Sequence, residues 1–153
     1  MSTLNQYVVF NLDEQFFALR LAAVERVIRS VGVTPLPGAP EIVSGAVNLQ
    51  GRIVPVFNVR RRFGLPEGEM ELSDQIIIAR THRRAVALLV DGVRGVHESP
   101  AEEVKAEEIL PGMKYVEGIM KLPDGIVLIH DLDKFLSLEE EKALDEVTEV
   151  TKA

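Results

Sequence analysis

The chain has no cysteine among its 153 residues, and only 5% of its residues are aromatic. Without cysteine, disulfide bonds, a thiolate nucleophile and zinc–sulfur sites are excluded, which suits a reducing compartment. The scarcity of aromatic side chains argues against a surface that stacks single-stranded bases. Apolar runs such as 85–90 are too short to cross a bilayer, and residues 1–10 lack the features of a signal peptide. We therefore expect neither a secreted nor a membrane-inserted protein.

Acidic residues outnumber basic ones, so the formal net charge is −7 and the sequence pI is about 5.0. A surface of this charge repels phosphate, which argues against nucleic acid and anionic membranes as main partners. Hydrophobic residues make up 46% of the chain, which is enough to form a core. The length fits one domain, or one domain built of two lobes.

The chain is rich in short β-type runs that are separated by turn residues. The runs cover 7–10, 16–19, 52–57, 75–80, 85–90, 115–122 and 126–129. This spacing predicts a small barrel or sandwich. Gln50-Gly51 is expected to turn the chain, and Pro123-Asp124-Gly125 is expected to form a tight hairpin with Asp-Gly supplying positive φ. Pro55 should lie at a sheet edge or bulge, since it cannot donate to a ladder. No repeat of fixed period is evident.

Helical periodicity is confined to three segments, 22–29, 40–47 and 131–147. The first has Val24, Val27 and Ile28 spaced for one helical face. The last is the longest candidate, and Leu132 and Phe135 belong to its expected buried stripe. Its acidic end is predicted to be solvated.

Residues that could carry chemistry are few and scattered. The histidines His82, His97 and His130 are not at metal-ligand spacing and are expected at the surface or at strand edges. No G-x-S-x-G nucleophile elbow and no phosphate-binding glycine loop occurs. The basic run 60–62 either contacts an acidic partner or forms a solvated flank of the preceding strand. The sequence therefore predicts no enzymatic site.

An ordered set of motifs runs along the chain. They are VTPLP with AP at 33–40, VSGAVNLQG at 43–51, IVPVFNV at 53–59, VDGVRGV at 90–96, and the closing strands and last helix at 113–136. Together they resemble the CheW family, and the correspondence covers nearly the whole chain. No single motif is specific, but the ordered set is.

The resemblance implies a mainly β fold of two small SH3-like five-stranded β-barrels that share a core, with short helices and a C-terminal helix. It implies a CheW-like domain over 1–138 and an acidic tail, partly helical or frayed, over 139–153. Such a protein is a non-enzymatic adaptor without cofactor or metal. Its implied partners are the regulatory domain of a CheA-type histidine kinase, itself CheW-like, and the cytoplasmic tip of methyl-accepting chemotaxis receptors. It would be cytoplasmic, recruited to receptor arrays.

The resemblance also suggests contact residues. Those expected to meet the receptor are Val24, Arg26, Val27, Asn48, Leu49, Gln50, Val93 and Val96. Those expected to meet the kinase are Ile53, Val54 and Val56. For several of these residues a core position is the alternative, and Asn48 could instead bond the backbone of its own turn.

The chain departs from the family pattern at three positions. Gln50 stands where arginine is usual, Asn58 where aspartate is common, and Arg26 where an acidic residue often occurs. Taken as one patch, these changes suggest an altered receptor partner, such as one in a non-flagellar chemosensory pathway. The main alternative function is an acidic small β-barrel that binds nucleic acid or a small ligand, which the charge and the lack of aromatic platforms disfavour.

Overall fold

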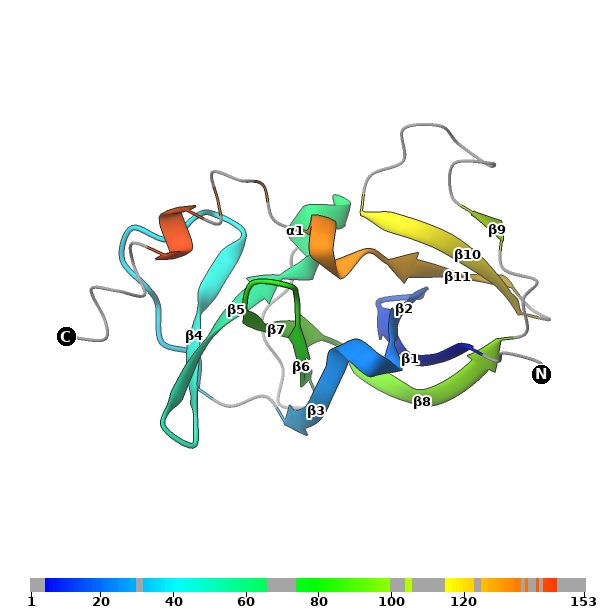
Figure 1. Cartoon of the computed structure of the whole chain (residues 1–153), viewed down its shortest axis with the longest axis horizontal. Helices are drawn as coiled ribbons and strands as arrows, with labels where there is room; N and C mark the ends of the chain where they lie inside the picture. The colour runs from blue at the N-terminus through cyan, green and yellow to red at the C-terminus, as the bar shows by residue number, and fades with distance from the viewer. Residues whose placement is uncertain are drawn as a thin grey trace.

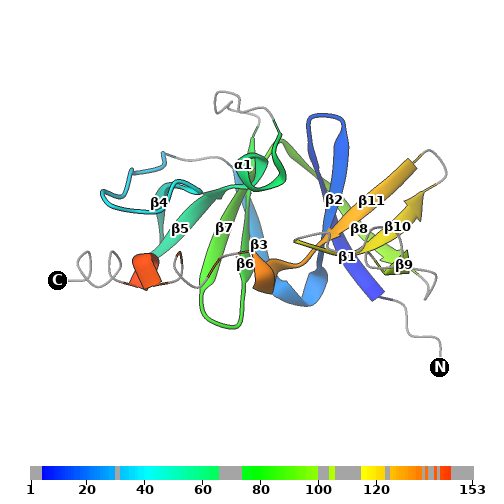
Figure 2. The ribbon, with the colours of Figure 1, turned by 90° about the horizontal axis from the view of Figure 1, so that it is seen from above.

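A computed structural model describes residues 5–29, 32–65, 74–99, 104–105, 115–122, 125–135, 137, 140 and 142–145. These residues form two β-sheets that lie side by side as two lobes (Figures 1 and 2). The first lobe is a six-stranded sheet of order β8-β1-β2-β11-β10-β9, in which β9 has only two residues. The second lobe is a five-stranded sheet of order β3-β6-β7-β5-β4. The predicted mainly β fold with two lobes is confirmed, apart from this short sixth strand.

The strands are short, and the few helices are shorter still. The strands are β1 (Asn5–Leu12), β2 (Gln15–Arg20), β3 (Val24–Arg29), β4 (Val43–Leu49), β5 (Arg52–Asn58), β6 (Gln75–Arg80), β7 (Ala85–Val90), β8 (Gly92–Ser99), β9 (Val104–Lys105), β10 (Val116–Leu122) and β11 (Gly125–His130). Three short helical segments are η1 (Leu21–Ala23) and η2 (Leu132–Lys134), both 3-10 turns, and the α-helix α1 (Val59–Phe63).

The central strands bury both of their faces. In β6, Ile77 packs into a core between the lobes, whereas Ile76 and Ile78 pack into a core inside the second lobe. In β7, Leu88 packs into the core between the lobes, and Ala87 packs into the core inside the second lobe. Because neighbouring strand residues point to opposite faces, a strand covered on both sides reads as a continuous apolar run.

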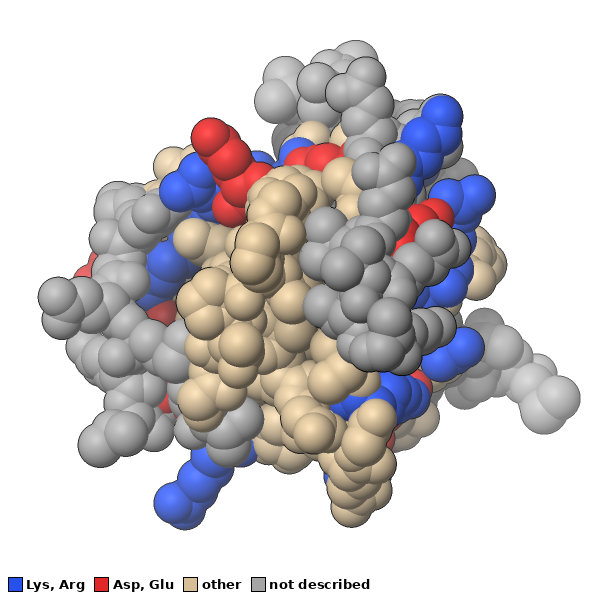
Figure 3. Space-filling view, turned by 90° about the vertical axis from the view of Figure 1, so that its left-hand side faces the viewer, with Lys and Arg blue, Asp and Glu red and all other residues tan. Residues whose placement is uncertain are grey.

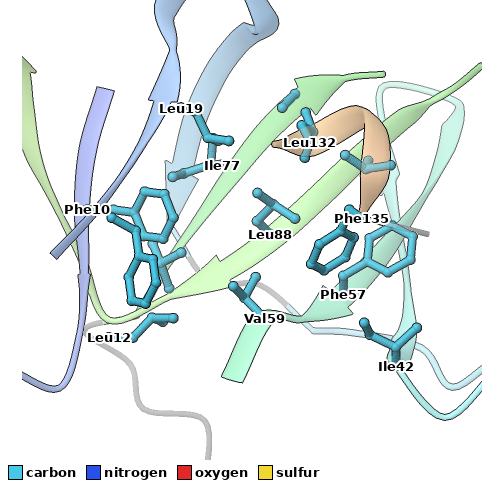
Figure 4. Packing of buried hydrophobic residues seen from close by; sticks show 14 of the residues in the cluster. Phe10, Leu12, Leu19, Ile42, Phe57, Val59, Ile77, Leu88, Leu132 and Phe135 are labelled. Atoms are coloured by element: carbon cyan, nitrogen blue, oxygen red, sulfur yellow. The ribbon is translucent and has the colours of Figure 1, made fainter. Parts of the chain in front are cut away.

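The core between the lobes is shared by both sheets (Figure 4). The first lobe contributes Phe10 and Phe17, which stack with ring centroids 5.8 Å apart, and the second contributes Phe57 and Leu88. Phe57 meets Phe135 edge to face at 5.4 Å. This common core confirms the expectation that the two lobes share a core.

The two lobes are built from an internal repeat. β4 reads VSGAVNL and β10 reads VEGIMKL, and in both strands the pairing register shifts at the second residue, before the glycine. β5 and β11 follow these strands across equivalent hairpins, with the same order of exposed and buried positions. Each ends at an N-cap of almost identical backbone, Asn58 at φ −84°, ψ 91° and Asp131 at φ −86°, ψ 92°.

A second part of the repeat relates β1, β2 and β3 to β6, β7 and β8. β3 begins Val-Glu-Arg-Val and β8 contains Val-Arg-Gly-Val. The β3–β6 ladder skips Glu25, and the β8–β1 ladder skips Arg94 at the equivalent place. The connection from β3 to β4 is shorter than that from β8 to β10. The number of residues that separates equivalent positions therefore differs between the two parts of the repeat. The repeat therefore has no fixed period, in agreement with the sequence analysis, although the structure shows that a repeat exists.

The repeats exchange strands. The first repeat gives β1 and β2 to the first lobe but β3, β4 and β5 to the second. The second repeat gives β6 and β7 to the second lobe but β8, β10 and β11 to the first. The two ladders that join the repeats, β3–β6 and β8–β1, are therefore equivalent, so the exchange of strands is reciprocal.

Two of the predicted helices are strands. Residues 24–29 form β3, because a bulge at Glu25 puts Val24 and Val27 on one face despite their helix-like spacing. Residues 43–47 belong to β4, which pairs with β5 and bridges Thr34 through Ala46. β-branched side chains favour strands when a partner strand is available, and the local pattern could not reveal that partner.

The last predicted helix is interrupted. Leu132–Lys134 form one 3-10 turn, and residues 142–145 are helical again. Leu132 and Phe135 are buried as predicted, at 7% and 1% exposure. Within the described part of the expected tail, Leu144 is fully buried in the core between the lobes.

The predictions made for the turns are confirmed in part. Gln50 and Gly51 both have positive φ, 53° and 87°, and close the β4–β5 hairpin as predicted. In the β10–β11 hairpin Leu122 pairs with Gly125, so Gly125 begins the strand instead of supplying positive φ; residues 123–124 lie outside the described residues. Pro55 is in an internal strand, but the pairing of β5 with β7 starts only at Val56.

Candidate functional site

Four predicted receptor residues, which we call the valine seam, lie on the faces of β3 and β8 that border the core between the lobes: Val24, Val27, Val93 and Val96. Val24 and Val93 pack at the edge of the core between the lobes. Val27 pairs with Ile77 and Val96 pairs with Val8, and residues directly opposite in a ladder share a face. Val27 thereby shares the face of Ile77, which packs into the core between the lobes, yet Val27 is 36% exposed and Val96 is 55% exposed. The seam is therefore the open edge of that core.

The second group of predicted receptor residues forms the tip of the β4–β5 hairpin. Asn48 Oδ1 accepts a hydrogen bond from the Gly51 N–H at 2.8 Å, so its amide shapes the turn. Leu49 packs partly against the core of the second lobe, and Gln50 is exposed. Arg52 joins this tip to β3 through its ion pair with Glu25 at 2.6 Å. The hydrogen bond from Arg52 is the main cause that lowers the pKa of Glu25.

The predicted kinase residues of β5 differ in exposure. Ile53 is 46% exposed, whereas Val54 and Val56 are fully buried in the core of the second lobe. The end of the molecule that carries β4 has a largely uncharged centre with charged side chains around it (Figure 3). Asn48 lies directly opposite Ile53 in the ladder, so one predicted receptor residue and one predicted kinase residue are neighbours.

Sequence reasoning missed an apolar hollow at the far end of the first lobe. It has a volume of about 520 Å³ and is lined by Glu14, Gln15, Phe16, Leu122, Gly125, Ile126 and Leu128. Phe16 is 37% exposed and Ile126 is 54% exposed. Ile126 is the repeat counterpart of Ile53, so the internal repeat is the signal that would have found it.

The three arginines of α1 bind acidic side chains of the same chain. Arg60 forms ion pairs with Asp13 and Asp91, both at 2.6 Å. Arg61 reaches Glu41 at 3.2 Å, and Arg62 binds Glu140 at 2.6 Å. The basic run is thus not a simple solvated flank: each arginine forms an ion pair with an acidic side chain from another segment of the chain.

His130 was predicted to lie at the surface or at a strand edge. It lies instead in the core, at 2% exposure. Its ring packs against Phe63 at 5.0 Å and Phe135 at 4.9 Å. Burial, followed by the nearby Arg62 charge, lowers its pKa from 6.5 to about 3, so the imidazole is neutral at pH 7. Among the described residues, no group of three or more His, Asp or Glu side chains could hold a metal ion.

The three departures from the family pattern do not form one patch. Asn58 caps α1 by accepting a hydrogen bond from the Arg61 N–H at 3.2 Å, and α1 lies on the upper side of Figure 1. Gln50 and Arg26 belong to the hairpin tip and to β3, on the lower side. Asn58 occupies the same N-cap position as Asp131 in the second repeat, although the Asp131 side chain makes no capping hydrogen bond there.

Comparisons with known proteins agree with this architecture. Residues 6–140 match the family model of the CheW-like domain. The chain is 32% identical over 128 residues to "Chemotaxis protein CheW" of Thermotoga maritima, covering 83% of this chain and 84% of the relative. It is 28% identical to the protein of the same name from Bacillus subtilis, covering 91% of each.

A solved structure shares the fold. The crystal structure of the scaffolding protein TtCheW from Thermoanaerobacter tengcongensis superposes with a TM-score of 0.81 and 28% identity, covering 90% of this chain and 96% of that one. No helix among the described residues is long and apolar enough to cross a membrane. The chain belongs to the CheW family, the non-enzymatic scaffolds that couple chemoreceptors to the kinase CheA in chemotaxis.

Proposed function

We propose that this chain acts in the cytoplasm at receptor arrays, with the valine seam and the β4–β5 hairpin tip facing the receptor. The observation that carries the proposal is the exposure of Val27 and Val96 at the edge of an otherwise buried core. Apolar groups at a polar surface give affinity when a partner buries them. The exposed Arg29, which lies on the same face of β3 as Val27, favours a partner with acidic side chains.

The kinase is proposed to meet the exposed Ile53 end of the second lobe. Ile53 is the member of the predicted trio whose side chain offers surface, whereas Val54 and Val56 hold β5 in place from the core. The hollow beside Ile126 is the repeat counterpart of this end, and we propose it as a second apolar contact for a CheW-like kinase domain. A scaffold of this kind acts by differential contacts with two states of its partners.

The test measures each variant against both partners, because Asn48 and Ile53 are cross-strand neighbours. Ile53→Glu should weaken binding to the regulatory domain of a CheA-type kinase about tenfold and leave receptor binding within about twofold. Asn48→Asp keeps an acceptor for the Gly51 N–H but adds a charge, so it should weaken receptor binding more than kinase binding.

Lys121→Asp is the matched control, because Lys121 is the repeat counterpart of Asn48 on the opposite lobe. It should leave receptor binding unchanged. Co-sedimentation and titration calorimetry with a receptor tip fragment and with the kinase domain measure the two affinities. The assignment is wrong if Ile53→Glu affects only the receptor, or if Lys121→Asp weakens receptor binding as much as Asn48→Asp.

A further inference from the structure

The helical segment that follows the last strand of each repeat contacts a hairpin turn of the other lobe. Arg60 in α1, which follows β5 of the second lobe, binds Asp13 in the β1–β2 turn of the first lobe at 2.6 Å. Asp133 in η2, which follows β11 of the first lobe, contacts His82 in the β6–β7 turn of the second lobe. We call these two contacts the Arg60 clamp and the Asp133 clamp.

The Asp133 clamp uses both oxygens of its carboxylate. Asp133 Oδ1 accepts a hydrogen bond from the backbone N–H of His82 at 2.9 Å. Asp133 Oδ2 lies 3.2 Å from Nε2 of the same histidine. The first of these contacts involves the backbone, so it fixes the position of the β6–β7 turn and not only of one side chain.

The two clamps occupy equivalent places in the repeat but have opposite charge. Arg60 and Asp133 are each the second residue after the N-cap, which is Asn58 in the first repeat and Asp131 in the second. In the first repeat the helical segment carries the cation and the hairpin turn carries the carboxylate. In the second repeat the helical segment carries the carboxylate. Both repeats thus keep the contact although the residue types differ.

The clamps supply direction, which the apolar core between the lobes lacks. Burial of apolar surface is non-directional, so it constrains the angle between the lobes less sharply than hydrogen bonds do. Hydrogen bonds weaken steeply when they are misaligned, and Arg60 holds Asp13 and Asp91 with one planar fork. Figure 2 shows α1 and the orange η2 on opposite sides of the central strands where the lobes meet. Two directional contacts that lie apart can fix the angle between two bodies.

We propose that Arg60 and Asp133 are positioning residues that set the angle between the two lobes. This role rests on the proposed function, in which the kinase contacts the Ile53 end of the second lobe and the hollow beside Ile126 in the first. Because these contacts lie on different lobes, the angle between the lobes sets the angle between the partners bound at each end. A scaffold without catalytic residues acts through such differential geometry.

The two clamps differ in how strongly they resist opening. The Arg60 side chain is 17% exposed and binds two carboxylates, those of Asp13 and Asp91. The Asp133 side chain is 47% exposed, and the His82 side chain is largely exposed. Solvent and salt weaken exposed polar pairs more than partly buried ones. Loss of the Asp133 clamp should therefore change the angle between the lobes at little cost in folding stability.

Pulsed electron paramagnetic resonance can measure the distance between the lobes in solution. The chain has no cysteine, so nitroxide labels attach only where cysteine is introduced, by Lys121→Cys in the first lobe and Arg29→Cys in the second. Both positions are exposed. In this labelled background Asp133→Ala removes both acceptor oxygens and should widen the distance distribution about twofold.

Asp133→Asn is the conservative variant, because its amide oxygen can still accept from the His82 N–H, and it should keep the narrow distribution. Lys134→Ala is the matched control on the same turn, since its side chain is exposed, and it should also keep it. Arg60→Lys is the second variant: lysine keeps the charge but loses the planar fork, so the distribution should widen. Circular dichroism and thermal unfolding check that each variant is folded.

Co-sedimentation of the unlabelled variants with kinase and receptor fragments measures assembly. Asp133→Ala should reduce assembly about threefold, while its affinity for the kinase regulatory domain alone stays within about twofold. The positioning role is overturned if Asp133→Ala and Arg60→Lys keep the narrow distribution, if Asp133→Asn widens it as much as Asp133→Ala, or if assembly is unchanged when the distance changes. Failure of the proposed function is seen separately, because the unmodified chain would then not bind the kinase domain.

Discussion

His130 illustrates how one residue can depart from its repeat counterpart. The equivalent position in the first repeat is Phe57, and both side chains lie in contact with Phe135. Neither ring nitrogen of His130 has a hydrogen-bond partner among the described residues. A buried polar group without a partner reduces stability, so the imidazole is tolerated here for its shape and not for its chemistry.

His130→Phe is expected to stabilise the fold by about 1–2 kcal/mol at pH 7 and to reduce its sensitivity to acid. The folded pKa is about 3 and the ordinary value is 6.5, so between these pH values the unfolded chain binds a proton that the folded chain does not. Stability therefore falls as the pH drops below about 6.5, by up to about 1.4 kcal/mol per pH unit.

Urea unfolding at pH 7 and pH 5 measures the effect, since the carboxylates are still largely ionised in this range. The unmodified chain should lose more stability between the two pH values than His130→Phe loses. Equal losses would mean that another group controls the acid response.

At the scale of the element, β-bulges set how the strands of the repeated motifs pair with their neighbours. β4 and β10 both shift register next to a glycine, Gly45 or Gly118. At Gly45 the backbone has φ 152°, and an added Cβ would lie 2.7 Å from Val33 Cγ1 and 2.9 Å from the carbonyl carbon of Thr34. Glycine is required there because the segment at Thr34 passes directly over β4 and bridges Ala46.

Gly45→Ala is expected to cost about 2–4 kcal/mol, because it adds backbone strain and displaces the segment at Thr34. Gly32→Ala is the control: nothing lies within 4 Å of the place that its Cβ would occupy, and it should change stability by less than about 0.5 kcal/mol. Chemical denaturation of both variants measures the difference. A similar small effect for both would show that the Thr34 segment can move aside without loss.

At the scale of the whole molecule, α1 ties the two repeats together. Arg60 is the centre of this contact, since it binds Asp13 in the β1–β2 turn and Asp91 at the β7–β8 junction. The Asp13 N–H also donates to Asp91 Oδ2 at 2.6 Å. The hydrogen bond from Arg60 lowers the pKa of Asp13, and the paired carboxylates raise the pKa of Arg60. One cation thus binds two carboxylates that lie close together and offsets one of their two negative charges.

Arg60→Met should lower the free energy of unfolding by about 1–3 kcal/mol, because it leaves Asp13 and Asp91 together without their cation. Arg61→Met is the matched control on the same helix, since its Glu41 partner is 90% exposed, and it should cost less than about 0.5 kcal/mol. Thermal unfolding at low and high salt compares them. An equal effect of the two substitutions would show that the Arg60 contact does not hold the repeats together.

The sequence by itself determined the class of fold, the apolar central strands and the order of the family motifs, because these depend on local alternation and composition. The resemblance led to the prediction that Val27, Gln50 and Val96 contact the receptor; these side chains are exposed in the structure, and the contact itself stays a prediction. The sequence could not separate Ile53 from Val54 and Val56, since exposure on a strand depends on which sheets cover each face.

Only the tertiary structure decided that Val24 and Val27 lie on a bulged strand instead of a helix, because their spacing of three residues fits both until β6 pairs with that strand. It alone revealed the exchange of strands between the repeats, which follows from long-range pairing that no local pattern encodes. The ion pairs of α1 also join residues far apart in the sequence, so charge counting could not assign their partners.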